Sequence, residues 1–537
     1  MCKEANAQNT PFGMRLAQTP ATPNAKALIV MTTYATSGSR QPRVRNCFRI
    51  VATAAALLLP SAEAVADGGA TFAIDLSASP TAISPLVYGL NDWARNDITA
   101  SLSYTLERLG GNRMTGYNWE TNASNAGNDW YDSSDTYLVS DFPAAERSIP
   151  GIVVTKFVDH ARAGNHPAIT TLQLAGYVAA DTDGTVTEEQ TAPSSRWKQV
   201  RIVKDGPLST TPDTTDAYVD LDEQVNFLIQ KYGTAANGGV FAYSMDNEPA
   251  LWSSTHSRIH PSAATVAEIL QTTTAAAGMV KNLDPSALVF GPALYGWNAF
   301  TSFQDAPDWE ALSGTYNWFI SAYLDGMKTS ADLAGKRLLD VLDLHYYPEA
   351  QGLNDNSESI RIVDNNDNSA GVTEARLQAP RSLWDSSYTE TSWITQYATL
   401  GPINMLPRVN ASINEYYPGT KLSITEYDFG GHQNFSGTLA EADVLGIFGR
   451  DGVFAACFWG DVIDGAEPNF IAPAFQLYRN FDGRDRDSSF GDQSIPASNP
   501  DPASYSCYAS IDSATGDIHV IVINKTASAQ PATISLG

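Results

Sequence analysis

The stretch FAYSMDNEPALWSSTHSRIHP, residues 241–261, is the most informative part of the sequence. Its first residues belong to a β-type run, Val240–Met245, which ends abruptly at Asp246-Asn247-Glu248-Pro249. Proline stops a strand because it has no N–H to donate and fixes its own φ. Glu248 is therefore predicted at the C-terminal tip of a strand, with Asn247 just before it. In a β/α barrel, these tips form the catalytic face.

Eight β-type runs follow Pro80, separated by stretches long enough for helices. Several runs are continuously apolar, as expected for parallel strands that are buried on both faces. Two of the intervening stretches, Asp222–Gly233 and Ala263–Leu283, have helical patterns. This alternation predicts an α/β fold built on a (β/α)8 barrel. The runs are Leu86–Leu90, Arg108–Thr115, Ala168–Val178, Val240–Met245, Ala287–Leu294, Leu339–His345, Lys421–Thr425 and Gly452–Trp459.

A smaller β domain is predicted beside the barrel, which we place at residues 81–480. Residues 481–537 become polar and then alternate, with a turn at residues 513–517 between two β-type runs. Such alternation around a turn is typical of antiparallel strands. We expect a β-sandwich there, with residues 67–80 contributing a strand from the other end of the chain.

The first 66 residues have the pattern of a secretory signal. Arginines precede the short apolar run Ile50–Leu59, and small residues follow it, so that cleavage is expected near Ala64 or Ala66. The run is too short for a permanent membrane anchor. Starting the chain at Met31 would give a signal of more ordinary length. The arginines are Arg40, Arg43, Arg45 and Arg49.

Charge and composition exclude some functions. The 537 residues carry a net charge of −26, although the first 66 contain seven basic and only two acidic residues. Such an acidic surface excludes a nucleic-acid role, and it fits a soluble, monomeric protein that acts on a neutral polymer. Eleven Trp and 23 Tyr suit stacking on sugars, but aromatic rings also fill cores. Cys457 and Cys507 are too few for a disulfide framework, and no Cys/His cluster has zinc-site spacing. Cys457 is predicted to be buried.

Polar and aromatic residues gather at the ends of six of the predicted strands, which describes a cleft at one end of the barrel. They are Arg113 with Tyr117-Asn118-Trp119-Glu120, Asp246-Asn247-Glu248, Tyr295-Gly296-Trp297-Asn298, His345-Tyr346-Tyr347, Glu426-Tyr427-Asp428 and Trp459-Gly460-Asp461. The long polar segment Gln351–Pro402 is expected to add a wall to this cleft, because long loops in compact domains tend to be functional.

Two glutamates at these tips match the chemistry of glycoside hydrolysis. Retaining hydrolysis uses two carboxyl groups about 5–5.5 Å apart across the glycosidic bond. Glu248 ends the fourth strand and Glu426 the seventh, on opposite sides of the barrel mouth. We assign Glu248 as the general acid/base and Glu426 as the nucleophile. Their pKa values must then differ, with that of Glu248 raised.

Neighbouring residues suggest supporting roles in substrate binding. Asn247 is placed to bond a sugar 2-hydroxyl, His345 or Tyr346 to orient Glu426, and Arg113 to keep Glu426 ionised. Trp459 is expected to floor a subsite. Each also has an ordinary structural reading, as a core histidine, core aromatic residue or surface ion pair. Further aromatic residues predicted to contact substrate are Trp119, Trp252, Trp297, Trp384 and Trp393.

Several segments resemble glycoside hydrolase family 44. They are DNEPALWSSTHSRIHP, GGNRMTGYNWE, KLSITEYDFGG, ARLQAPRSLWDSSYTETSWI and ISPLVYGLN, within a resemblance from Phe72 to the C-terminus. The resemblance implies a TIM-like barrel with a β-sandwich and retaining endo-hydrolysis of β-1,4-glucans such as xyloglucan and soluble cellulose derivatives. It assigns catalysis to Glu248 and Glu426 without a catalytic cofactor. It also implies a structural calcium on Glu120, Asp213 and Asp216, whose oxygens suit that ion.

Other readings stay open. The resemblance implies several more strands beyond the segment that ends at Gly537, so we expect an incomplete sandwich with an exposed edge. A barrel hydrolase of xylan or mannan would share both glutamates and differ in its cleft. A glycan-binding protein with a degenerate site is a third reading, which the presence of both glutamates disfavours.

Overall fold

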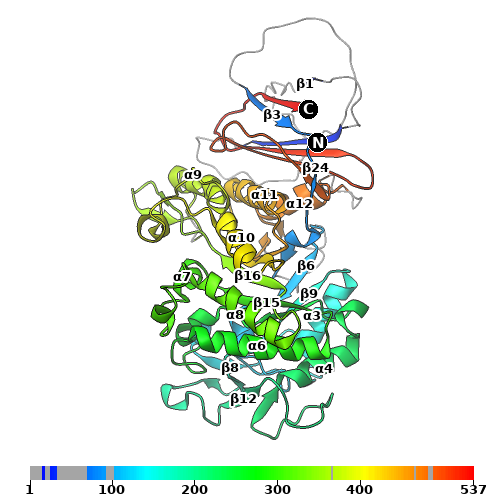
Figure 1. The fold of residues 1–537 in the computed structure, drawn as a ribbon, viewed down its shortest axis with the longest axis vertical. Coiled ribbons are helices and arrows are strands. Elements are labelled where there is room, and N and C mark those ends of the chain that lie inside the picture. The colour runs from blue at the N-terminus through cyan, green and yellow to red at the C-terminus, as the bar shows by residue number, and fades with distance from the viewer. Residues whose placement is uncertain are drawn as a thin grey trace, which may run out of the picture.

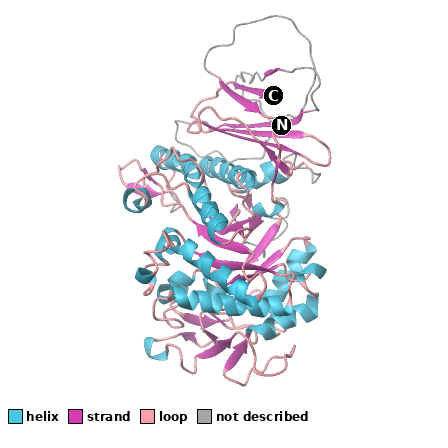
Figure 2. Ribbon diagram, in the orientation of Figure 1, coloured by secondary structure: helices cyan, strands magenta, loops and turns pink. Residues whose placement is uncertain are grey.

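A parallel β/α barrel carries a smaller all-β domain (Figures 1 and 2). The computed structural model describes residues 15–17, 25–32, 69–91, 102–363, 367–464, 467–481 and 488–537. The predicted apolar signal run and its cleavage site lie outside these residues. Among the described helices, none combines the length and the apolar character needed to cross a membrane.

The barrel closes from eight parallel strands, which confirms the predicted fold class. The barrel interior is apolar toward the N-terminal ends of the strands, where Leu106, Ile169, Phe290 and Cys457 pack together. Polar side chains occupy the interior toward the C-terminal ends of the strands. In chain order the strands are β5 (Gly89–Leu90), β6 (Leu106–Leu109), β9 (Ala168–Leu172), β14 (Ala242–Met245), β15 (Leu288–Leu294), β16 (Val341–Tyr346), β19 (Lys421–Tyr427) and β20 (Ala455–Phe458).

Helices surround the barrel and include both predicted ones, as α4 and α6. The longest, α6, begins with a capping box in which Thr265 and Glu268 satisfy each other's backbone N–H groups. The main helices are α3 (Ile152–Ala163), α4 (Leu221–Tyr232), α6 (Val266–Leu283), α8 (Phe319–Ala334), α10 (Met405–Tyr416), α11 (Phe435–Arg450) and α12 (Ala472–Arg479).

Several predicted strands are shorter than the sequence suggested. The run 86–90 begins within a 3-10 helix, Pro85–Val87, and only Gly89–Leu90 joins the barrel. The run 108–115 leaves the barrel at Leu109, because Gly111 adopts φ +83° and the chain turns into the short helix α2 (Asn112–Thr115). The run 168–178 divides into β9 and β10 (Tyr177–Ala179), with Gly176 at φ +93° between them. β10 pairs with β12 (Trp197–Arg201), which pairs with β13 (Tyr218–Asp220). The hairpin of β7 (Ser124–Asn125) and β8 (Ser133–Asp135) pairs with β11 (Gly184–Thr185).

The segment 351–402 begins as a hairpin of β17 (Gln351–Leu353) and β18 (Ser359–Arg361) and continues into α9 (Ala370–Gln378). It does not serve only as a cleft wall. The buried Arg376 of α9 donates to Ser436 at the start of α11, and Gln378 donates to the carbonyl of Ala503 in the β domain. This part of the segment therefore covers the outside of the barrel next to the β domain.

The β domain contains a three-stranded sheet, β1-β26-β3, and a five-stranded sheet, β2-β25-β24-β23-β4. The two sheets enclose a core that includes Phe72, Cys507 and Val520. β3 comes from residues 67–80, as predicted. Unexpectedly, β1 and β2 come from within the predicted leader, and they pair with strands that would otherwise be edges. The strands are β1 (Arg15–Ala17), β2 (Ala25–Thr32), β3 (Ala70–Ile74), β4 (Thr81–Ala82), β23 (Gln493–Ile495), β24 (Tyr505–Ile511), β25 (Ile518–Asn524) and β26 (Ala532–Leu536).

Alternation along β24 and β25 explains how the β domain joins the barrel. Cys507 and Val520 face the sandwich core, whereas Tyr508 and Ile521 face the opposite way and join the barrel core. These residues pack against α11, which is buried on nearly every side, from Ser436 to Gly449. Figure 1 shows α11 between the two domains.

A buried ion pair crosses this interface. Lys525 Nζ lies 2.7 Å from Asp443 Oδ2, and each side chain is only 2% exposed. The hydroxyl of Tyr508 also donates to Asp443. A buried carboxylate depends on such partners, because removing one leaves an uncompensated charge in a medium of low polarity.

We expect Lys525→Met to lower the free energy of unfolding by about 3 kcal/mol, because the Asp443 carboxylate stays buried without its cation. Urea denaturation followed by circular dichroism measures this change. Lys328→Met is the matched control, since its ion pair with Asp332 is exposed and should contribute little. Equal destabilisation by the two substitutions would contradict the prediction.

Candidate active site

The strand that opens the site ends in an unusual backbone. After β14, Asp246 and Glu248 both adopt left-handed conformations, with φ +64° and +45°. Pro249 then begins a short 3-10 helix, Pro249–Leu251. The N–H of Glu248 donates to the carbonyl of Ala293 on β15, at 3.1 Å. This turn brings Glu248 to the barrel mouth, where the sequence predicts it.

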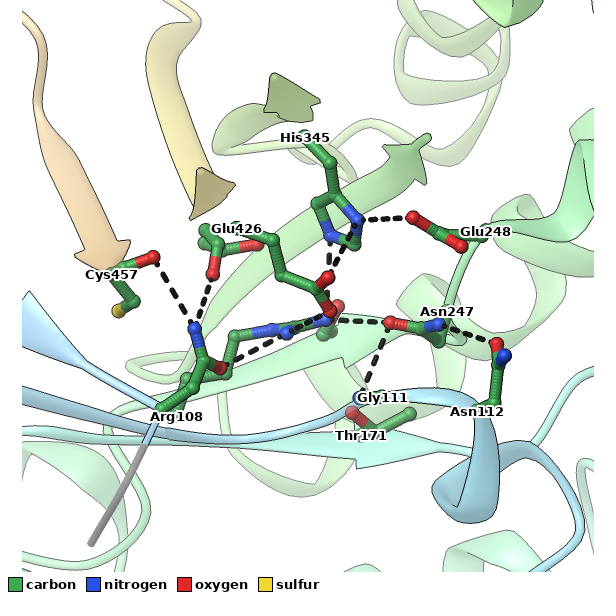
Figure 3. A network of polar contacts seen from close by, with 12 residues as sticks. Arg108, Gly111, Asn112, Thr171, Asn247, Glu248, His345, Glu426 and Cys457 are labelled. Carbon is green, nitrogen blue, oxygen red and sulfur yellow. Dashed lines mark hydrogen bonds and ion pairs between the residues drawn. The ribbon is translucent and has the colours of Figure 1, made fainter. Parts of the chain in front are cut away.

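Glu426, on β19, is held from three directions (Figure 3). Arg108 Nη1 donates to its Oε1 at 2.7 Å, and the hydroxyl of Tyr347 donates to its Oε2 at 2.9 Å. His345 Nδ1 lies 3.4 Å from Oε2. Because the Glu426 side chain is only 6% exposed and Arg108 is fully buried, this ion pair lies in the barrel interior. The arrangement places a guanidinium and a phenol hydroxyl against the two oxygens of this carboxyl group.

His345 bridges the two glutamates. Its Nδ1 lies 2.9 Å from Glu248 Oε1, and its Nε2 lies 3.5 Å from Arg108 Nη2. A guanidinium only donates, so Nε2 must accept and the ring proton belongs on Nδ1, which donates to Glu248. Burial lowers the pKa of His345 to about 4, helped by the positive charge of Arg108, so the ring is neutral.

The environment of Glu248 differs from that of Glu426. Burial raises the pKa of Glu248 to about 7, and only the charge of Arg108 acts in the opposite direction to a notable extent. Carboxylate oxygens of Glu248 and Glu426 lie within 4.8 Å of each other. The site therefore contains two neighbouring carboxyl groups, one disposed to hold a proton near neutral pH and the other paired with a cation.

Asn247 is fixed between the glutamates and the strand β6. Its Oδ1 accepts from Arg108 Nη2 at 2.9 Å and from the Gly111 N–H at 3.3 Å, while its Nδ2 donates to Asn112 at 3.2 Å. Trp459, at the tip of β20, is 36% exposed, and a Cβ at Gly111 would come within 2.6 Å of its ring. The indole therefore lies against Gly111, whose N–H donates to Asn247, and its role as a subsite floor stays a prediction.

Two predicted partners of Glu426 are corrected. Arg113 pairs with Asp135 at 2.7 Å, and Arg108 occupies the position expected for it. Tyr346 is buried against Phe429, while the next residue, Tyr347, contacts Glu426. Alternation along a strand gives the reason, because His345 and Tyr347 share the inner side and Tyr346 points the other way.

Most of the predicted tryptophans do not line the site as aromatic surfaces. Trp119, Trp252 and Trp297 are at most 5% exposed and pack in the main core, because large apolar rings are more stable away from water. Trp384 stacks on Arg450 at the C-terminal end of α11, at the barrel–sandwich interface. Trp393 is half-buried against the main core.

The predicted calcium ligands do not form a cluster in this structure. Glu120 Oε2 and Asp216 Oδ1 lie 3.0 and 3.6 Å from Lys198 Nζ, so both carboxylates share one ammonium, and Asp213 is exposed. Within the described ranges, Glu248, His345 and Glu426 are the one group of three acidic, His or Cys residues with ligand atoms within 4.8 Å of one another. The structural calcium therefore stays a prediction.

Two features near the site have signals that the sequence interpretation did not use. Arg108 and its neighbour Glu107 are charges within an apolar strand, which requires buried partners; Glu107 binds His160 and His166 outside the barrel. Trp130 is 60% exposed and stacks edge-on with Tyr131. Asp129 accepts from Asn112, which contacts Asn247, so these rings lie on the same side of the molecule as the site.

Comparisons with known proteins find relatives that are similar in sequence and in fold. The sequence model of glycoside hydrolase family 44 matches residues 123–350. Endoglucanase A of Paenibacillus lautus is 46% identical over 87% of this chain, and a β-mannanase/endoglucanase A of Caldicellulosiruptor saccharolyticus is 46% identical over 84%. The chain spans 65% and 34% of their lengths. A Paenibacillus polymyxa xyloglucanase of family 44, solved with xyloglucan, is 45% identical with a TM-score of 0.80, over 86% of this chain and 88% of that one.

Tyr347→Phe should lower kcat on a soluble β-glucan about tenfold or more, because it removes a hydrogen bond to the charged Glu426. Tyr346→Phe is the matched control, since its buried hydroxyl has no hydrogen-bond partner among the described residues. Reducing-sugar assays on both variants measure the difference. If Tyr346→Phe lost as much activity as Tyr347→Phe, the assignment of Tyr347 would be wrong.

Proposed function

Because the chain belongs to glycoside hydrolase family 44, we propose that it is a secreted endo-β-1,4-glucanase that hydrolyses glucans such as xyloglucan with retention of configuration. The observation that carries this proposal is the approach of the Glu248 and Glu426 carboxylates to within 4.8 Å. Retaining enzymes have carboxyl groups about 5–5.5 Å apart, whereas inverting enzymes need about 6.5–9.5 Å to admit a water between them.

In the first step, Glu248 acts as the general acid. Its Oε1 accepts from His345 Nδ1–H, so the acidic proton resides on Oε2. The raised pKa of Glu248 keeps that proton in place near neutral pH until the glycosidic oxygen takes it. His345 stays neutral and fixes the orientation of the carboxyl group.

Glu426 attacks the anomeric carbon while the bond to the leaving oxygen breaks, which forms a glycosyl-enzyme ester. Tyr347 and Arg108 hold its two oxygens in fixed directions before the attack. In the second step, the ionised Glu248 removes a proton from water, and the resulting hydroxide displaces Glu426 from the sugar. Atoms and protons balance, since Glu248 regains the proton that it gave to the leaving group.

Exposed aromatic residues support a polysaccharide substrate. Trp459 lies against Gly111, whose N–H donates to Asn247, and the exposed Trp130 and Tyr131 follow Asp129, which accepts from Asn112. Rings of this kind offer flat apolar faces to sugar rings, and their N–H and O–H groups can bond sugar hydroxyls. Asn247 is proposed to bind the 2-hydroxyl next to the scissile bond.

One alternative substrate class has specific support. The Caldicellulosiruptor relative is named as a β-mannanase as well as an endoglucanase, so mannan is a second candidate.

Secretion is proposed from the arginine-flanked apolar run at residues 50–59, and it suits a polymer substrate that cannot enter a cell.

Glu248→Gln and Glu426→Gln should each lower the rate at which reducing ends are released from xyloglucan at least 100-fold, because each removes one of the two reacting carboxyl groups. A general acid/base typically contributes a rate factor of about 10²–10⁴. The matched control is Glu349→Gln, a carboxylate in the segment after β16 that pairs with Arg361. A panel of xyloglucan, carboxymethyl cellulose, xylan and mannan identifies the substrate. Binding of glucan without cleavage by the wild type would favour a glycan-binding protein instead.

The pH profile of kcat/KM should fall above about pH 7, tenfold per pH unit, as Glu248 loses the proton that it donates. The sign follows from the role, since the general acid is active in its protonated form, which exists below its pKa. Circular dichroism across the same range controls for unfolding. A profile that is flat to pH 9 would exclude Glu248 as the acid.

A further inference from the structure

We infer that Asp246 is a positioning residue that holds the turn bearing Asn247 and Glu248, an inference that rests on the proposed function of Glu248. Its side chain is fully buried directly behind the site. The residue two positions before Glu248 thus holds the turn from which that glutamate extends.

The Asp246 carboxylate accepts four hydrogen bonds. Its Oδ1 accepts from the Thr115 hydroxyl at 2.6 Å and from the Asn247 N–H at 2.7 Å. Its Oδ2 accepts from the N–H groups of Leu174 and Ala175, at 2.5 and 3.1 Å. These donors come from the segments after β6, β9 and β14, so one carboxylate joins the exits of three neighbouring barrel strands.

This position stabilises the left-handed turn. Residues other than glycine seldom adopt φ near +60°, and Asp246 and Glu248 both do so here. The bond from the Asn247 N–H to Asp246 Oδ1 closes this turn from within. Thr115 ends α2, whose first residue, Asn112, contacts the side chain of Asn247. Asp246 therefore fixes Asn247 both through its backbone and through α2.

Replacing this carboxylate with an asparagine amide would break hydrogen bonds of the turn. The amide Nδ2 would face an N–H group wherever it was placed, since three of the four partners are backbone donors. Only the Thr115 hydroxyl can turn to accept. At least one N–H of the turn or of the β9 segment would lose its acceptor, and the turn would relax.

The test compares Asp246→Asn with Asp284→Asn, a matched control at the other end of the barrel. Asp284 is also buried, and it accepts from the N–H groups of Ala235, Ser286 and Ala287 and from the Ser286 hydroxyl. Two substrates are used: xyloglucan, whose leaving group needs a proton, and 2,4-dinitrophenyl β-cellobioside, whose leaving group does not.

For Asp246→Asn we expect kcat/KM on xyloglucan to fall about 100-fold, as for a displaced catalytic group. The fall on the dinitrophenyl substrate should be at least tenfold smaller, because Glu426 cleaves that bond without an acid. Asp284→Asn should lower Tm and leave both kcat/KM values unchanged. Thr115→Val, which removes one donor, should show the same substrate difference at smaller size if Asp246→Asn folds poorly.

Equal losses on the two substrates, or a profile like that of Asp284→Asn, would overturn the inference. The proposed function is tested separately, by comparing the release of reducing ends from xyloglucan by the wild type and by Glu248→Gln. A crystal structure of Asp246→Asn gives a readout that does not depend on activity. We expect Glu248 to leave His345 in that structure, and an unmoved turn would refute the positioning role.

Discussion

The arrangement of side chains at the C-terminal end of the barrel depends on the buried ion pair between Arg108 and Glu426. Taking two charges out of water is costly unless their remaining hydrogen-bonding groups are satisfied. The two terminal nitrogens of Arg108 meet most of this need at four strand tips, through Asn91 after β5, Asn247 after β14, His345 on β16 and Glu426 on β19, while its Nε has no hydrogen-bond partner among the described residues. Beneath them, Asp343 accepts from Ser423 and Thr425 within the barrel. The requirement to satisfy one guanidinium thus fixes the relative positions of the residues proposed to react.

The same arrangement separates the properties of the two glutamates. Arg108 and Tyr347 contact Glu426, whereas Glu248 has a neutral histidine as its near neighbour and a pKa raised to about 7. Because Arg108 also forces the proton of His345 onto Nδ1, the guanidinium acts on both carboxyl groups, on one directly and on the other through the imidazole. Two carboxyl groups within 4.8 Å can in this way take opposite roles in one reaction.

The β domain is joined to this site by the helix α11. Tyr427, the residue after Glu426, donates to Glu441 on α11 at 2.8 Å, and Asp443, two residues further, pairs with Lys525 of the sandwich. Gly446 of the same helix leaves room for the ring of Tyr508, which lies 2.4 Å from where a Cβ would stand. The sandwich therefore packs against the helix that follows the strand of Glu426. One face of its five-stranded sheet lies in the sandwich core, and the other covers an apolar face of the barrel.

The eight strands and the two glutamates could be predicted from the sequence because they depend on local order, namely apolar runs, helical spacing and a proline directly after Glu248. Residues such as Arg108, Tyr347 and Asp246 lie on the same runs, but their roles depend on which side of the strand faces the barrel and on which partners come from strands distant in sequence. The exposure of the tryptophans could not be predicted for the same reason. Trp119 and Trp130 both stand among polar residues in the sequence, but Trp119 is buried in the core and Trp130 is exposed. Local sequence therefore determined the barrel and the identity of its carboxyl groups. Only the tertiary structure decided which charges meet, because burial and hydrogen-bond partners are properties of the closed barrel and not of any one strand.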